Sequence, residues 1–378
     1  MEKLKIIIAI DSFKGSATSS EAAYALETGI REVCPDADIR RIPVADGGEG
    51  TMDALISSGR GRIVTVCVHD PLMRPVKANY GILSDHTAVI EMAQASGLTL
   101  LSREERNPLK TSSFGTGELI RDALSRGIRK IVLTIGGSAT NDAGIGLLRA
   151  LGFRFTDTHG RELAGKGEEL GRIGQIDLSG VLPELEEATF EVLCDVTNPF
   201  YGPEGATMVF SRQKGATPEM RNQLEQGMIR FARLAEARTG IDMNDVKGSG
   251  AAGGMGGTAQ LFLNAEMRSG AGFVLDRVGF DSVALDADLV ITGEGKIDRQ
   301  TLYGKVPMVV LERMKGKGIP VIAVCGRSED EAELLDAGFR SILSLYDESL
   351  TEREMMEKTR TLRELQNRIA EYMKDHVK

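Results

Sequence analysis

The segment Lys5–Ile10 has the sequence KIIIAI, a nearly continuous apolar run of strand length that ends at Asp11. A loop containing glycine follows, and Thr18 and Glu21 have the spacing of a capping box, which predicts the start of a helix. A strand that is apolar on both sides and leads through a loop into a helix is typical of a parallel sheet with helices on both faces. This pattern restricts the chain to the α/β class.

The same order of strand, loop and helix recurs at both ends of the chain, and the middle differs. Near the ends we expect strands at 39–44, 62–68, 288–292, 320–325 and 341–345, and helices at 306–315 and 351–374. In the middle we expect an antiparallel pair at 76–83 and 88–92, strands at 130–135 and 190–194, and helices at 117–126, 143–151 and 217–237. We therefore predict a doubly wound, mostly parallel, Rossmann-like sheet domain built from both termini, 1–68 and 284–378. A second, mixed α/β domain is inserted at 69–283.

Length and charge exclude several classes of protein. A chain of 378 residues has room for two domains, and no apolar run approaches the ~20 residues of a membrane helix. The net charge is −9 and the basic residues are scattered, so we expect no nucleic-acid partner. The four cysteines and four histidines show no metal-binding spacing, which gives little support to a zinc or Ser-His-Asp mechanism. We expect a cytoplasmic protein without membrane association.

Ligands of open α/β sheets bind beyond the carboxyl ends of the strands, so the loops after the strands are candidate sites. The first, AIDSFKGS at 9–16, offers Ser12 and the cation of Lys14. The second, ADGGEGT at 45–51, places Asp46 and Glu49 around Gly47 and Gly48, where successive backbone N–H groups can face an anion at a helix start. A solvated lysine and a simple turn are the structural alternatives.

Three further loops carry polar side chains. TIGGSATNDAG at 134–144 offers Ser138, Asn141 and Asp142, of which the last two could also be plain helix caps. CDVTNPFYGPEGA at 194–206 places Asp195 directly after an apolar strand, where it can hold Mg²⁺ or cap the loop. Lys214 in SRQKGAT is either a cation of the site or a surface lysine.

The loop ITGEGKIDRQTLYGKVP at 291–307 has the densest charge. Four charged side chains follow a predicted buried strand there: Glu294, Lys296, Asp298 and Lys305. Acids and lysines gathered at a strand end suit phosphoryl transfer, in which catalysis is mostly positioning and neutralisation of charge. A structural network of ion pairs is the alternative.

Two common nucleotide motifs fail in their context. GRELAGKG at 160–167 has the spacing of a P-loop, but Gly167 stands where a Ser or Thr must bind Mg²⁺. GSGAAG at 248–253 fits a dinucleotide fingerprint but follows a polar segment instead of a strand, although it could still be a nucleotide or hinge loop.

Taken together, the loops resemble the bacterial glycerate kinase family. The resemblance is carried by DSFKGS, ADGGEGT, SSFGTGELI, IGGSATNDAG, CDVTNPFYG, QKGAT, GAAGGMGG and TGEGKIDRQTLYGKVP. It implies transfer of the γ-phosphoryl group of ATP to D-glycerate with Mg²⁺, giving 2-phosphoglycerate, in a cleft between two α/β domains. Arg212 before QKGA and Ser249 in GSGAAGG depart locally from the family pattern.

On this basis we assign roles to the loop residues. Asp195 and Asp298 or Glu294 are the candidate Mg²⁺ ligands. Lys14 and Lys296 are expected to bind the glycerate carboxylate or the transferred phosphate, and Asp46 to orient or deprotonate the attacking hydroxyl. The remaining polar residues are expected to bind substrate or phosphate.

Other functions stay open at this point. A glycerate 3-kinase would give 3-phosphoglycerate, a nicotinamide-dependent hydroxy-acid dehydrogenase would use GSGAAG, and a binding protein would close on a carboxylate without chemistry. The sequence leaves monomer and homodimer open.

Overall fold

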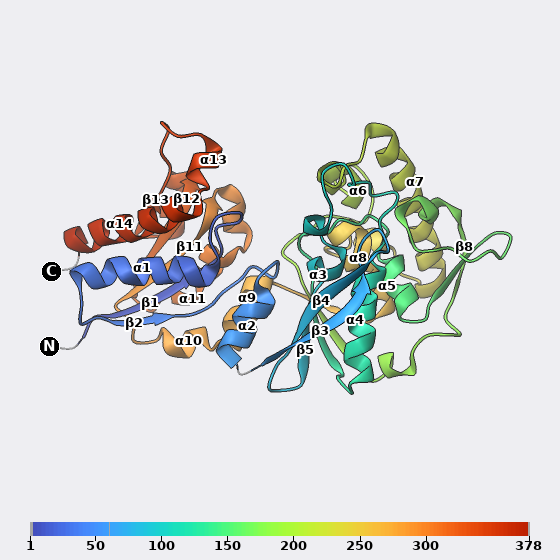
Figure 1. Cartoon of the computed structure of the whole chain (residues 1–378), viewed down its shortest axis with the longest axis horizontal. Helices are drawn as coiled ribbons and strands as arrows, with labels where there is room; N and C mark the ends of the chain where they lie inside the picture. Colours follow the sequence, from blue (N-terminus) through green and yellow to red (C-terminus); the bar gives the residue numbers. More distant parts are fainter. Residues whose placement is uncertain (1–2, 60, 377–378) are drawn as a thin grey trace. The chain divides into compact units, whose positions relative to one another are not determined.

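The computed structural model describes residues 3–59 and 61–376. The chain divides into two compact units. The terminal unit comprises Met1–Asp46, Asp53–Gly59 and Ser269–Lys378, and the inserted unit comprises Gly47–Met52 and Arg60–Arg268. The fold is α/β, with a doubly wound parallel sheet built from both ends of the chain and a mixed α/β part inserted between them (Figure 1).

The terminal unit contains one sheet of five strands, all parallel. In spatial order these are β13 (Ser341–Ser344), β12 (Val321–Ser328), β11 (Leu289–Ile297), β1 (Lys5–Ile10) and β2 (Asp38–Arg41). The central pair therefore joins one strand from each end of the sequence.

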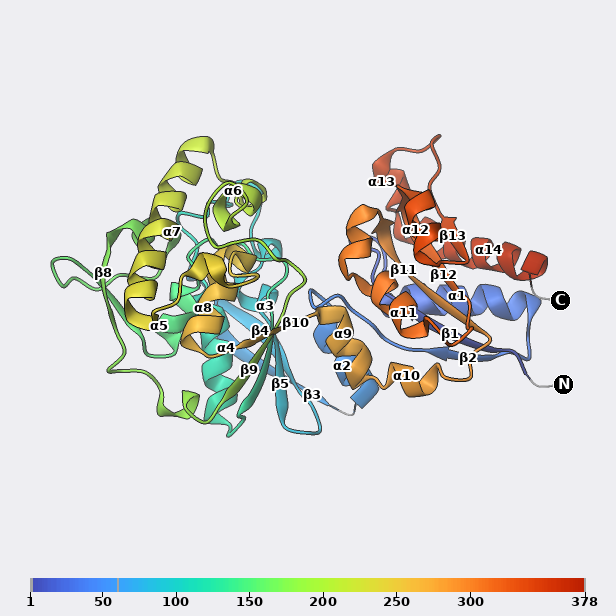
Figure 2. The same cartoon turned by 180° about the vertical axis from the view of Figure 1, so that it is seen from behind.

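Helices cover both faces of this sheet. On one face lie α1 (Ser19–Val33) and α14 (Lys358–His376), side by side in Figures 1 and 2, with the short α13 (Glu352–Met355) before α14. The helices that pack on the other face are α9 (Gly270–Arg277), α10 (Phe280–Val283), α11 (Val306–Met314) and α12 (Glu331–Ala337). The helix α2 (Thr51–Gly59) begins where the chain passes between the units.

The apolar run of β1 is explained by this double cover. Ile6, Ile8 and Ile10 belong to the core beneath α1 and α14, whereas Ile7 and Ala9 belong to the core on the opposite face. Successive side chains of a strand point to opposite faces, so a strand buried on both must be apolar throughout.

The inserted unit contains a mixed sheet of six strands. Its order is β10 (Glu266–Arg268), β9 (Thr189–Leu193), β6 (Lys130–Thr134), β5 (Thr87–Glu91), β4 (Pro75–Ile82) and β3 (Arg62–His69). The pairs β3–β4 and β4–β5 are antiparallel and the others parallel. A separate antiparallel pair is formed by β7 (Arg154–Asp157) and β8 (Ile173–Asp177).

One contiguous apolar core holds the inserted unit together. Its helices are α3 (Ala93–Ser96), α4 (Phe114–Ser125), α5 (Ile145–Ala150), α6 (Ala206–Phe210), α7 (Pro218–Thr239) and α8 (Met255–Phe262). Phe231 of α7 lies close to the rings of Phe155, Phe200 and Phe262, so the longest helix is anchored by an aromatic cluster.

Two strands differ from the sequence-based expectation. The segment at 62–68 was expected with the terminal domain, but β3 is an edge strand of the inserted unit's sheet, since its whole length pairs antiparallel with β4. The strand expected at 288–292 continues through Ile297, so part of the predicted charged loop is strand. Separate folding of the predicted domains, 1–68 with 284–378 and 69–283, stays a prediction.

In the part of the chain that the structure describes, no helix combines the length and the apolar character needed to cross a bilayer.

Candidate active site

The topology of the terminal unit singles out one position for a ligand. From β1 the chain proceeds to β2 on one side, whereas from β11 it proceeds to β12 and β13 on the other. The order of strands therefore reverses between β1 and β11. In open α/β sheets ligands bind at this reversal, beyond the carboxyl ends of the strands.

A buried carboxylate stands at the end of β1. Asp11 is only 4% exposed, and the backbone N–H of Ser12 donates to its Oδ1 at 2.6 Å. Burial and the neighbouring charge of Asp46 raise the pKa of Asp11 to about 7, with a smaller contribution from Glu294 and opposition from Ser12 and Lys14. Negative groups are thus concentrated where the topology expects a ligand.

Lys14 provides the nearest positive charge. Its Nζ lies 3.1 Å from Oδ2 of Asp46, and its side chain is largely exposed. Partial burial opposes the charged ammonium, but the carboxylates of Asp46, Asp11 and Glu294 outweigh that cost and raise the pKa of Lys14. The predicted neighbourhood of Lys14 and Asp46 is therefore present in the structure.

Glu294 enters the same region from β11. Thr301 Oγ1 donates to its Oε1 at 2.8 Å, and Lys305 Nζ lies 3.3 Å from its Oε2. Burial raises the pKa of Glu294, although Lys305 and Thr301 counteract the effect. Lys305 is the residue directly before α11, so a strand and a helix start hold this ion pair between them.

Lys296 and Asp298 form a different, more exposed group. The ammonium of Lys296 pairs with Asp298 at 3.2 Å and with Glu329 at 2.9 Å, and the lysine side chain is 50% exposed. The backbone N–H of Asp298 donates to Thr301 Oγ1 at 3.2 Å, which links this group to Glu294. Lys296 is therefore held mainly by surface ion pairs.

A cavity of about 550 Å³ opens beside these residues, all of it within the terminal unit. Its lining combines the charged groups with apolar side chains: Asp11, Ser12, Phe13, Lys14, Ser16, Glu294, Gly295, Lys296, Lys305, Gly326, Arg327, Glu329, Leu345, Tyr346, Glu352, Met355, Met356, Arg360 and Thr361. We call it the β1–β11 cavity.

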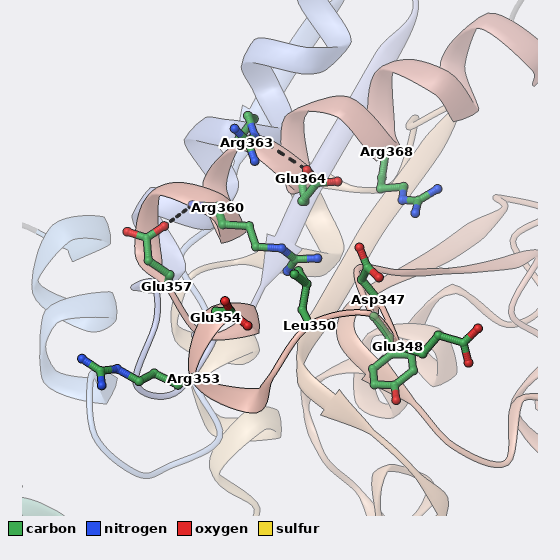
Figure 3. Close-up of a pocket in the computed structure, with 11 residues that line it drawn as sticks. Asp347, Glu348, Leu350, Arg353, Glu354, Glu357, Arg360, Arg363, Glu364 and Arg368 are labelled. Carbon is green, nitrogen blue, oxygen red and sulfur yellow. Dashed lines mark hydrogen bonds and ion pairs between the residues drawn. The ribbon is translucent and has the colours of Figure 1, made fainter.

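A second pocket of about 840 Å³ shares Tyr346 and Arg360 with that cavity. Figure 3 shows charged side chains of both signs around it, drawn mostly from α13, α14 and the segment before them. Arg363 pairs with Glu364, and the carboxylate of Glu357 accepts from the backbone N–H of Arg360 (Figure 3). This pocket lacks the buried acids of the β1–β11 cavity.

The polar residues predicted at 138–142 and 214 lie together inside the inserted unit. Lys214 is fully buried, and its Nζ donates to Ser138 Oγ at 2.8 Å and to the backbone oxygen of Thr140 at 2.6 Å. Burial lowers the pKa of Lys214 to about 7. The alternative of a surface lysine is wrong, because Lys214 is buried and its ammonium is hydrogen-bonded to the loop that contains Ser138 and Thr140.

Asp142 and Asn141 are also buried. The Asp142 carboxylate accepts from the backbone and hydroxyl of Ser113, both at 2.7 Å, and from the backbone N–H groups of Gly144 and Gly146. Burial raises its pKa. Asn141 donates to Thr207 Oγ1 at 3.1 Å. These contacts give both residues a structural role, and a substrate contact by either stays a prediction.

Glycines of ADGGEGT and GSGAAG lie where the backbone turns sharply or approaches another segment closely. Gly47 has a φ of +86°, and a Cβ on Gly136 would approach Gly48 Cα to 3.0 Å, so this turn packs against the loop at 136. Glu49 is exposed at the turn before α2. A Cβ on Gly253 would lie 2.7 Å from Asn141 Cα. GSGAAG therefore serves close packing of backbones, and a 3₁₀ helix at Met243–Asp245 precedes it instead of a strand.

Asp195 follows β9 in the inserted unit and is partly exposed. Its assignment as a metal ligand stays a prediction. Sequence reasoning gave no role to Asp11, Thr301 or Arg360, although Asp11 had the available signal of an acid placed directly after a buried strand.

Comparison with known proteins identifies the family of this chain. A sequence profile described as the glycerate kinase family matches residues 6–374. The chain belongs to the glycerate kinase family.

Individual relatives agree with this assignment. The glycerate kinase of Bacillus subtilis (strain 168) is 47% identical over 344 residues, which cover 90% of each chain. The glycerate 2-kinase of Escherichia coli (strain K12) is 44% identical over 348 residues, 90% of this chain and 91% of the relative. A crystal structure described as that of a candidate glycerate kinase 2 from Salmonella typhimurium LT2 matches with a TM-score of 0.84 and 44% identity, covering 99% of each chain.

Membership in the glycerate kinase family defines the class of chemistry. The chain is an enzyme, a phosphotransferase that acts on small molecules, one of which is a nucleotide. The resemblance noted from the loop motifs is confirmed by the profile and the relatives.

The resemblance of the loop motifs implies a divalent cation, whose protein ligands would be carboxylates of this region. Among residues 3–59 and 61–376, no three His, Cys, Asp or Glu side chains are arranged to hold a metal ion by themselves. Mg²⁺ at phosphate sites is usually held by one or two carboxylates together with phosphate oxygens. Asp11, which is buried, and Glu294, which is partly buried, fit such a shared site, since a cation beside them would offset the cost of holding their carboxylates away from water.

Proposed function

We propose that this enzyme transfers the γ-phosphoryl group of ATP, in the presence of Mg²⁺, to the C2 hydroxyl of D-glycerate, giving 2-phosphoglycerate and ADP. The observation that carries the proposal is the cluster of Asp11, Lys14, Asp46, Glu294 and Lys305 at the reversal of strand order. The similarity to a glycerate 2-kinase supports the choice of the 2-hydroxyl.

The residues of the cluster divide the work. Lys14 and Lys305 bring two ammonium groups next to carboxylates, and both can neutralise charge that develops on the transferred phosphoryl oxygens. Asp46 Oδ2 orients Lys14 and accepts the proton of the attacking hydroxyl. As the new O–P bond forms, the bond between the γ-phosphorus and the β–γ bridging oxygen breaks, and ADP leaves with that oxygen.

Asp11 and Glu294 are proposed to hold the metal. When bound, Mg²⁺ would supply positive charge that offsets the negative charge of the phosphate groups. Thr301 and Lys305 keep the Glu294 carboxylate in one orientation, and the N–H of Ser12 does so for Asp11. The earlier assignments of Asp195 and Asp298 as ligands, and of Lys296 as a phosphate contact, remain proposals beside this one.

Product analysis tests the proposal directly. The purified protein is incubated with Mg²⁺, ATP and D-glycerate, and the product is examined by phosphorus-31 NMR with proton coupling. We expect the phosphorus signal to be split by the single proton on C2. Splitting by the two protons on C3 would show a 3-kinase and contradict the proposal. The Asp46→Asn variant, which keeps the side-chain shape, serves as the control and should form product at least about 100-fold more slowly.

A further inference from the structure

We propose that the β1–β11 cavity binds the purine nucleoside of the phosphoryl donor, with the base against Tyr346, Met355 and Met356; this inference rests on the proposed function. The occupant is the adenosine part of ATP or ADP. The charged residues of the same cavity would then face its phosphates.

The first observation is an exposed apolar wall. Tyr346 is 41% exposed and Met356 42%, and both line the cavity together with Leu345 and Met355. Large apolar side chains that remain exposed in a concave site usually cover a ligand. Aromatic and methionine side chains suit the planar, polarisable face of a purine.

The second observation is that the tyrosine is held in place. The Cζ atom of Arg327 lies 5.0 Å from the centroid of the Tyr346 ring, in a cation–π contact. Arg360 Nη2 donates to the backbone oxygen of Leu345 at 3.1 Å, which fixes the segment that carries the tyrosine. A ring with a fixed plane loses little entropy when a base stacks on it.

The third observation is that an apolar surface and a group of charged side chains line the same cavity. The apolar wall shares the cavity with Asp11, Lys14, Glu294 and Lys305. A nucleoside triphosphate has an apolar-faced base joined to a polyanion, and the lining provides a surface for each. Glycerate has only three carbons and no apolar face, so it could not pack against a tyrosine and two methionines.

Two glycines on neighbouring strands form part of the cavity wall. Gly295 of β11 and Gly326 of β12 both line the cavity, so the wall has no side chain at these two positions. A Cβ added at Gly326 would lie 2.6 Å from the backbone oxygen of Gly295, so the close packing of the two strands accounts for that glycine. The volume of about 550 Å³ lies within the ordinary range of small-molecule pockets.

The neighbouring pocket of Figure 3 is a poorer match. Within its lining Arg363 pairs with Glu364, and Leu350 and the shared Tyr346 are its apolar members. The observations therefore favour the β1–β11 cavity for the nucleoside.

Two binding probes separate the base from the phosphates. Isothermal titration calorimetry with Mg²⁺ measures the Kd of ADP and, separately, of inorganic tripolyphosphate. For Tyr346→Ala we expect the Kd of ADP to rise about tenfold, the scale of one lost stacking contact, while the Kd of tripolyphosphate changes by less than about twofold. Lys305→Met should weaken the binding of both probes.

The chain offers a matched control in Tyr24. Tyr24 is also an exposed tyrosine with a guanidinium over its ring, Arg41 Cζ at 5.5 Å from the centroid, but it lies outside the cavity. Tyr24→Ala should leave both Kd values unchanged. Met356→Gln, which keeps the side-chain length, provides a second cavity variant if Tyr346→Ala is unstable, and circular dichroism verifies that each variant is folded.

The possible results are distinct. If Tyr346→Ala and Met356→Gln bind ADP as tightly as wild type, or if ADP and tripolyphosphate weaken equally, the nucleoside site is wrong, even when the wild type still phosphorylates glycerate. If ADP binding depends on Tyr346 but the wild type forms no phosphoglycerate, the nucleoside site stands and the proposed glycerate kinase reaction fails.

Discussion

At the scale of single residues, the candidate site is defined by the buried carboxylate of Asp11 and the partly buried carboxylates of Asp46 and Glu294. Burial and the charges of Asp46 and Glu294 raise the pKa of Asp11, and Lys14 compensates only in part. Burying groups of like charge lowers the free energy of unfolding unless a bound ligand or cation neutralises them. Such an arrangement is common at functional sites.

The raised pKa of Asp11 predicts a pH dependence of stability. Between its ordinary value near 3.8 and the folded value of about 7, the folded protein binds a proton that the unfolded chain has released. The free energy of unfolding should therefore fall as pH rises through this window and lose nothing further from Asp11 above it. In Asp11→Asn this contribution is absent, so the variant should gain stability relative to wild type between pH 4.5 and pH 8.

Urea denaturation of the metal-free protein at several pH values measures this difference. Asp11→Gly would be a poor comparison because it also frees the backbone, whereas asparagine keeps the shape. A stability difference between wild type and Asp11→Asn that is constant from pH 4.5 to pH 8 would refute the raised pKa.

The lysines of the site should differ in importance. Lys14 lies among the carboxylates at the end of β1, whereas Lys296 pairs with Asp298 and Glu329 at the surface. We expect Lys14→Ala to lower kcat/KM for ATP by about 100-fold, and Lys296→Ala by less than about tenfold. Steady-state kinetics on folded variants decides between them. An equally large loss in Lys296→Ala would restore its sequence-based role as a phosphate contact.

The sequence indicated the loops of the candidate site but not which side chains pair within them. Lys14, Asp46 and Glu294 could be found because charged residues and glycines follow apolar strands. The pairing of Glu294 with Thr301 could not, since it depends on how the chain turns after β11. Nor does the sequence show that Arg327 lies over Tyr346.

At the scale of elements, β11 is the clearest difference from expectation. Its residues Glu294 and Lys296 pair with Cys325 and Arg327 of β12, beyond Gly293, where the sequence suggested that the strand had ended. Glycines in a strand normally indicate a loop or a close approach of backbones. At Gly293 the reason is a close approach of backbones, because a Cβ on this residue would overlap the backbone oxygen of Val324.

This close approach predicts the effect of one methyl group. Gly293→Ala should lower the free energy of unfolding by about 2–3 kcal/mol, since β11 and β12 must separate to accept the side chain. Gly272→Ala in α9 is the matched control, because its Cβ would make only ordinary contacts, at 3.6 Å. It should be neutral or slightly stabilising. Urea denaturation provides the comparison, and equal stability of the two variants would contradict this account of Gly293.

Most other elements were predictable from apolar periodicity and caps. The capping box at Thr18 and Glu21 does open α1, and the antiparallel pair β4–β5 and the long α7 also occur where expected. The position of β3 was not predictable, because a strand's sheet is decided by its partner and not by its own sequence.

At the scale of the whole molecule, the two units have separate apolar cores. Among residues 3–59 and 61–376, the core of the inserted unit is formed by residues between Val64 and Met267, and the two cores of the terminal unit by residues outside that range. A segment with its own core can fold independently. The predicted domain organisation follows this principle.

A fragment experiment tests that independence. We expect residues 61–268, expressed alone, to unfold cooperatively in urea, with far-ultraviolet circular dichroism and intrinsic tyrosine fluorescence giving coincident transitions. A matched fragment that ends at 188, before β9, removes strands from the sheet and should not fold. Non-cooperative unfolding of 61–268 would show that the insert needs the terminal unit.

The pairing of β1 with β11 in the terminal unit affects the order in which the protein can fold during translation. β1 emerges first, but its neighbour β11 is not synthesised until residue 289, and α14, which packs beside α1, comes last of all. Domains fold during translation as soon as their parts are available. The insert can therefore fold while the isoleucines of β1 are still exposed, and they stay without their native neighbours until β11 and α14 have been synthesised.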